Sequence, residues 1–228
     1  MVRFLVGLTI QSALFAILIF GPGWAFSGTL VWPRGMLALA VLVAVSGVGG
    51  LWFLKTDPAL TRERASAPKP QTMRDALATG AIAISGIVWF VLVAWDEHRV
   101  HLPSLPAALS IAAGLTVFST GVGVIIWTFR VNTFAVSVVK VQDDRAQRVI
   151  DSGPYSLVRH PMYLGAVAFF AGLGFILGST VAALLAVPLF IVAFTPRILV
   201  EEAVLRQELI GYAAYQSRVR TRIVPGLF

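Results

Sequence analysis

The chain has 228 residues, of which 57% are hydrophobic and only 13% are charged. Soluble domains are roughly 45–50% apolar and about 25% charged, so this composition favours a membrane protein. The absence of cysteine excludes disulfides and thiolate metal sites, and basic loops beside a membrane explain the net charge of +7 better than a nucleic-acid partner does.

Four long apolar stretches carry no charged residue. They are Phe4–Phe20, Met36–Leu54, Ala76–Trp95 and Leu105–Phe129. A membrane-spanning helix needs about 20 such residues, so each stretch is long enough when some tilt is allowed. A cleaved signal peptide is the alternative for the first stretch, but its apolar part is longer than usual. We therefore predict four spanning helices within residues 1–130 and a second region in residues 131–228.

The second region contains a predicted helical hairpin over residues 162–196. Its arms are Met162–Leu177 and Val181–Thr195, and the turn-forming cluster Gly178–Thr180 separates them. An arm of about 15 residues makes a helix of roughly 24 Å, which is shorter than the bilayer core of about 30 Å. The hairpin therefore either crosses thinned lipid or enters and leaves on the same side.

A helix of a different kind follows the hairpin. Ile198, Leu205, Leu209 and Tyr212 recur at helical spacings, and Pro225 ends the pattern. This periodicity predicts an amphipathic helix beside the membrane. The predicted fold class is thus all-α: a polytopic bundle of four spanning helices, a short hairpin and an amphipathic helix.

The basic residues predict which side of the membrane each connection occupies. Of the 18 Lys and Arg residues, only Arg34 and Arg99 lie in the first and third connections between the predicted helices. Cytoplasmic segments are enriched in Lys and Arg. We therefore expect the amino terminus, the second and fourth connections and the carboxyl-terminal tail to be cytoplasmic.

Polar residues flank the hairpin at both ends. Before it stand Ser152-Gly153-Pro154-Tyr155 and then Arg159-His160-Pro161-Met162-Tyr163-Leu164-Gly165. Gly153-Pro154 favours a turn that presents Tyr155, and Pro161 favours an extended backbone at His160.

After the hairpin come Arg197 and, one helical turn later, Glu201 and Glu202. Because the two arms are short and antiparallel, we expect these residues to lie beside the preceding motif at the cytoplasmic face. The simpler alternatives are that Arg159 contacts lipid headgroups and that the two glutamates form a solvated face.

These motifs, in this order, resemble the isoprenylcysteine carboxyl methyltransferase family, and related phospholipid methyltransferases share them. The resemblance covers roughly residues 132–225. Integral-membrane sterol reductases carry a motif similar to Arg159–Tyr163 alone. The resemblance implies an integral membrane methyltransferase that binds S-adenosylmethionine without a Rossmann fold and requires no metal.

The resemblance also implies roles for individual residues. Arg197 and His160 would be catalytic, and Arg197 and Asn132 would bind the acceptor. Lys140 occupies a position where the family can have glutamine. The cofactor contacts would be Lys140, Gln147, Arg148, Val149, Ile150, Tyr155, His160, Pro161, Met162, Tyr163, Glu201 and Glu202.

The sequence leaves two chemical classes of methyl acceptor, a carboxylate and an amine. Arg197 favours a carboxylate on a prenylated or otherwise lipid-like molecule in the bilayer. An aminophospholipid such as phosphatidylethanolamine would have to lose a proton, for which His160 or Glu202 would be the candidate base. The remaining alternatives are an NADPH-dependent sterol-type reductase and a non-catalytic lipid-binding membrane protein.

Overall fold

The computed structural model describes residues 2–58, 61, 72–134 and 147–224, and these contain helices and no strand. Five helices have the length and hydropathy to cross a membrane. Four of them lie within α1 (Val2–Ser27), α2 (Pro33–Thr56), α5 (Ala107–Val131) and α7 (Thr180–Glu208), and the other covers α4 (Met73–Trp95) and the turn that follows it to Val100. The four spans predicted from hydropathy are all present, and the all-α bundle is confirmed.

The fifth long helix, α7, differs from the prediction. A second arm ending at Thr195 and a separate helix from Ile198 were expected, but α7 continues through Pro196 to Glu208. Proline removes one backbone hydrogen bond, which a packed membrane helix tolerates. At 29 residues the helix is about 43 Å long, enough to cross the bilayer core and extend beyond it.

The first arm of the hairpin, α6 (Pro161–Leu177), is as short as predicted. It ends at Gly178, whose φ of +111° suits a residue without a side chain. Ser179 then caps α7 by accepting a hydrogen bond from the amide of Ala182 at 3.0 Å. After α7, Gly211 turns the chain into the short helix α8 (Tyr212–Arg218).

Helices α5 and α6 pack antiparallel with their backbones in close contact. Gly114 and Gly121 on α5 face Gly172 and Gly165 on α6. A Cβ atom on Gly121 would lie 2.6 Å from the carbonyl oxygen of Gly165, so no side chain fits there. Small residues allow such an approach between membrane helices. This contact fixes where the end of α5 lies relative to the start of α6.

An aromatic layer joins α4, α6 and α7. Phe170 and Phe190 stack with ring centroids 4.0 Å apart, and Trp89 packs edge-on against Phe170. The indole of Trp89 also donates a hydrogen bond to the carbonyl of Ala182 at 3.0 Å. The hairpin is therefore packed inside the bundle along α4 and α5.

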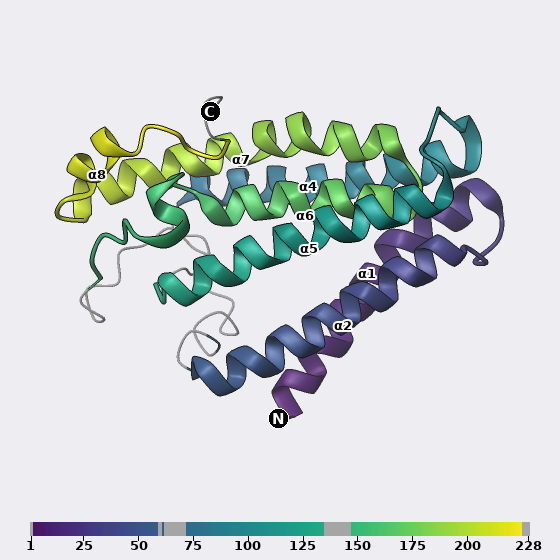
Figure 1. The fold of residues 1–228 in the computed structure, drawn as a ribbon, viewed down its shortest axis with the longest axis horizontal. Helices are drawn as coiled ribbons and strands as arrows, with labels where there is room; N and C mark the ends of the chain where they lie inside the picture. The colour runs from purple at the N-terminus through teal and green to yellow at the C-terminus, as the bar shows by residue number, and fades with distance from the viewer. Residues whose placement is uncertain (1, 59–60, 62–71, 135–146, 225–228) are drawn as a thin grey trace.

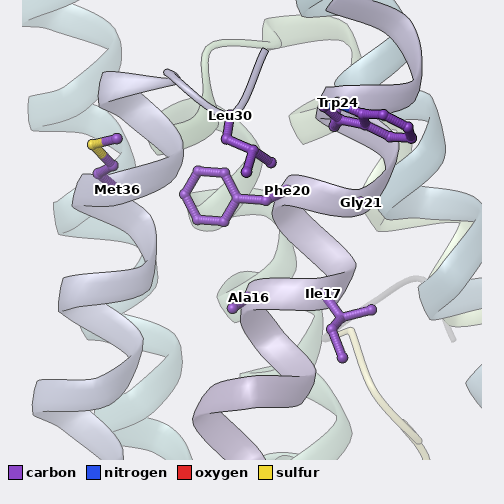
Figure 2. A pocket seen from close by; sticks show the side chains of 7 residues that line it. All are labelled: Ala16, Ile17, Phe20, Gly21, Trp24, Leu30 and Met36. Atoms are coloured by element: carbon purple, nitrogen blue, oxygen red, sulfur yellow. The ribbon is translucent and has the colours of Figure 1, made fainter. Parts of the chain in front are cut away.

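Helices α1 and α2 run at an angle to the other helices and join at the end of the molecule opposite α8 (Figure 1). Near that joint lies a groove of about 550 Å³. Figure 2 shows its apolar lining, including Phe20 and Trp24 of α1, Leu30 of the connection and Met36 of α2. It contains no ionisable side chain and none of the candidate site residues.

At that same end, the buried carboxylate of Asp96 links two connections between helices. A π-helical turn (Asp96–Val100) follows α4, and Asp96 accepts hydrogen bonds from the hydroxyl of Ser179 and the amide of Leu102. Asp96 thus joins the connection before α5 to the turn between α6 and α7.

Candidate active site

The predicted polar motifs gather at the end of the bundle where α8 lies (Figure 1). There α5 ends, a 3-10 turn over Gly153–Ser156 precedes α6, and α7 leaves the apolar core. Antiparallel packing of α6 on α7 places the first turn of one helix beside the last turns of the other. Residues about 40 positions apart in sequence therefore meet.

Glu202 is the centre of a buried ionic cluster. Its side chain is 4% exposed, and its Oε1 accepts a hydrogen bond of 2.7 Å from Arg159 Nε. The same oxygen lies 3.2 Å from His160 Nε2, and Oε2 accepts from Arg222 Nε at 3.2 Å. Both carboxylate oxygens are therefore engaged with neighbouring side chains.

Arg159 and His160 also hold the tail of the chain. The amides of Arg159 and His160 donate to the carbonyls of Thr221 and Arg222 at 3.0 and 2.8 Å. Arg159 Nη1 donates to the carbonyls of Val219 and Arg220, at 2.7 Å each. Because Arg159 is 7% exposed and makes all these contacts, it is a structural residue of this cluster and does not lie at the lipid surface.

Glu201 lies next to this cluster and has a different environment. It is only partly buried, and Tyr163 donates a hydrogen bond to its Oε2 at 3.4 Å. The Tyr163 ring is held between His160 and Phe194, with centroid distances of 5.8 and 4.7 Å. Glu201 thus presents a carboxylate beside two ordered rings.

Tyr155 joins the end of α5 to the turn before α6. Asn132, which caps α5, donates from Nδ2 to the Tyr155 hydroxyl at 2.8 Å, and Tyr215 donates to the Tyr155 carbonyl at 2.8 Å. Burial raises the pKa of Tyr155 above its usual range, the bond from Asn132 lowers it in part, and the charge of Glu201 raises it further. Tyr155 therefore stays protonated at neutral pH and can donate a hydrogen bond.

The other residues that the resemblance assigns to the cofactor differ in how deeply they are buried. Val149 packs with Tyr155 against a small cluster formed by Leu209, Tyr212 and Tyr215. Gln147 and Ile150 are partly buried beside it, and Arg148 is exposed. At the start of α6, Pro161 is buried and Met162 partly buried. Lys140 lies outside the described residues.

Arg197 is placed differently from the expectation. It is buried, and its Nη1 forms an ion pair with Asp75 and a hydrogen bond of 3.1 Å to Thr79 Oγ1, both on α4. The carboxylate partner expected from an acceptor molecule is here supplied by the chain itself. Arg197 and Glu201 lie one helical turn apart on α7.

Two residues of this region were not predicted from the sequence. Asp75 directly precedes the uncharged stretch that defined the helix, and a lone acid at that boundary was a signal for it. Arg222 lies in a tail rich in arginine, where no pattern distinguished it. Within the described residues, no group of three or more potential ligands could hold a metal ion.

The fold and site define a multi-pass helical membrane protein with a polar, tyrosine-lined site at one end of its bundle. Residues 109–209 match the family model described as phospholipid methyltransferase. This family is part of the superfamily of integral membrane methyltransferases, so the resemblance to phospholipid methyltransferases is confirmed over these residues. A comparison of the chain with curated proteins found no match. The matched segment runs from α5 to the end of α7 and leaves out Asp75 and α8.

Proposed function

We propose that this protein transfers a methyl group from S-adenosylmethionine to an acceptor held in or near the lipid bilayer. The observation that carries the proposal is the partly exposed carboxylate of Glu201, held beside Tyr163 at the end of α7. The family match over α5–α7 supports the same reaction class. We take this end of the bundle to be cytoplasmic, because basic residues such as Arg148, Arg206 and Arg218 lie there.

The residues at this end fit the chemistry of the cofactor. Its methionyl part carries an ammonium group, for which Glu201 supplies a carboxylate, and its adenine ring requires flat or apolar neighbours, which Tyr155 and Val149 provide. Asn132 and Tyr155 supply further polar atoms. Glu202 differs, because Arg159, His160 and Arg222 already engage its oxygens. We infer that Glu202 positions the site, while Glu201 contacts the ligand.

S-adenosylmethionine held beside Glu201 and Tyr155 would supply a methyl group on a sulfonium, and the sulfur would keep the electron pair of the broken bond when the acceptor takes that carbon. The protein contributes alignment and the exclusion of water, which can supply much of the reduction in barrier. The ring of Tyr163 packs between His160 and Phe194, which fixes its position at this end of the site.

Two acceptor classes have separate support. The resemblance of Arg197, four residues before Glu201, to the family's acceptor-binding arginine supports carboxyl O-methylation of a prenylated or otherwise lipid-linked acid, which needs no base, although Asp75 already pairs with Arg197. The phospholipid methyltransferase match favours N-methylation of phosphatidylethanolamine. In the second case the ammonium must first lose a proton, for which His160 or Glu202 would be the candidate base.

Binding measurements on the purified protein in detergent test the reaction class. We expect binding of S-adenosylhomocysteine and none of NADPH. Binding of NADPH alone would indicate a sterol-type reductase, and binding of neither would favour a non-catalytic lipid-binding protein.

A matched pair of variants tests the role of Glu201. Glu201→Gln is expected to weaken S-adenosylhomocysteine about tenfold or more, which corresponds to a loss of ~1.4 kcal/mol. The control is Glu208→Gln, which removes the same charge from an exposed position on the same helix and should leave binding unchanged. Equal affinities of the two variants would contradict the assignment.

A further inference from the structure

Asp75 forms a buried ion pair with the arginine that stands next to the site. Asp75 lies in the first turn of α4 and is 1% exposed, while Arg197 is 6% exposed. Thr79, one turn further along α4, accepts a second hydrogen bond from the same guanidinium nitrogen at 3.1 Å. The other carboxylate oxygen of Asp75, Oδ2, is buried and has no hydrogen-bond partner among the residues that the structure describes.

This pairing changes what Arg197 can offer to an acceptor. A guanidinium that is paired with a buried carboxylate has its positive charge largely compensated. An anionic acceptor that approaches Arg197 must compete with Asp75, and it brings a second carboxylate next to a buried one. Two carboxylates in a site of low polarity repel each other strongly. A neutral or cationic headgroup meets no such penalty.

We propose that Asp75 is a specificity-determining residue, which holds Arg197 and thereby disfavours anionic acceptors. The inference rests on the proposed function, since it concerns the acceptor of the same site. Asp75 lies on α4, outside the segment 109–209 that matches the family model. Selectivity for the acceptor is thus controlled by a helix other than those that carry the cofactor residues.

The wild-type protein alone provides the first test. The probes are S-farnesyl-N-acetylcysteine, which carries a carboxylate, and its methyl ester, which is neutral but otherwise identical. Their binding is measured in detergent by the rise in melting temperature, without the cofactor. Wild type is expected to bind the ester at least as tightly as the acid. A clear preference for the acid would overturn the proposal, whatever the outcome of the cofactor experiments.

The variant Asp75→Asn provides the second test. It keeps the shape of the side chain and removes the charge, so the preference should change in favour of the acid by about tenfold or more. Asp151→Asn is the matched control, because it removes a charge from an exposed ion pair with Arg218. The control should keep the wild-type preference.

The double variant Asp75→Asn/Arg197→Gln tests whether Arg197, once it is no longer paired with Asp75, is the group that binds the acid. It replaces the ion pair by two amides, and the gain in acid binding should disappear. Binding of S-adenosylhomocysteine by each variant shows that it is folded.

Turnover gives an independent comparison. With labelled cofactor, Asp75→Asn should raise the kcat/KM for the farnesylated acid relative to dioleoylphosphatidylethanolamine about tenfold, mainly through a lower KM for the acid. A folded Asp75→Asn variant with the wild-type ratio would show that Asp75 is merely structural. Absence of cofactor binding in wild type would instead contradict the proposed function and leave the first test valid.

Discussion

Arg159 Nε donates to Glu202 Oε1 over 2.7 Å, and both side chains are almost completely excluded from solvent. This bond joins the segment just before α6 to the last turns of α7. Since Arg159 also holds the carbonyls of residues 219 and 220, it connects three segments that are distant in sequence. The neighbouring Tyr163 and Glu201 owe their positions to this connection.

Replacing Arg159 by alanine is therefore expected to destabilise the protein strongly. The change leaves Glu202 with fewer partners in a buried site and frees the tail, and breaking a buried pair costs about 3–5 kcal/mol. The loss is measured by thermal unfolding in detergent, monitored by tryptophan fluorescence. Arg218→Ala is the control: its ion pair with Asp151 is mostly exposed, so it should cost at most about 1 kcal/mol. Similar losses for both variants would disprove the structural role of Arg159.

Removing the Tyr163 hydroxyl should affect the ligand more than the fold. In Tyr163→Phe the ring keeps its packing against Phe194, but Glu201 loses a partner 3.4 Å away. A hydrogen bond to a charged group is worth about 1.5–3 kcal/mol, and this long one should fall near or below the lower end. We expect S-adenosylhomocysteine affinity to fall a few-fold, with an unchanged melting temperature. An equal loss of stability would mean that the hydroxyl is mainly structural.

The helices could be predicted from the sequence because each depends on local composition. Phe4–Phe20 and Met36–Leu54 are apolar over a length that only a membrane helix explains, and no long-range contact alters that conclusion. The same local argument failed at Pro196. The predicted arm stopped at Thr195, directly before this proline, whereas packing of α7 against α4 and α6 keeps the helix continuous through that residue.

The pairing of charged residues could not be predicted in the same way. Glu202 meets Arg159 and Arg222, but the tail offers several other arginines at similar distances along the chain. Asp75 and Arg197 are 122 positions apart and lie on helices whose mutual rotation hydropathy does not specify. The motifs indicated the candidate positions, whereas the partners emerged only from the packing of α4, α6 and α7.

The glycine contact between α5 and α6 should be intolerant of any side chain. A Cβ on Gly121 would lie 2.6 Å from the backbone of both Gly165 and Phe169, so the helices must move apart in Gly121→Ala. Overpacking of this kind costs about 1–3 kcal/mol. Because Asn132 caps the same helix, cofactor affinity should fall as well.

Gly123→Ala is the matched control for this change. Gly123 lies on the same helix, and a Cβ there would meet no atom of the described residues within 4 Å. Alanine is the better helix former, so stability should stay the same or rise slightly. The measurement is the melting temperature of both variants in one detergent. A stable Gly121→Ala protein would show that the close contact is not needed.

The sidedness of the membrane can be tested directly because the chain has no cysteine of its own. Ser104 is exposed in the connection before α5, and Ser217 is exposed on α8 at the site end. The distribution of basic residues predicts that the connection at Ser104 faces away from the cytoplasm and that α8 faces it. In intact cells, a membrane-impermeant maleimide should therefore label Ser104→Cys and spare Ser217→Cys. Opening the cells should expose Ser217→Cys, and the reverse pattern would place the candidate site on the outer face.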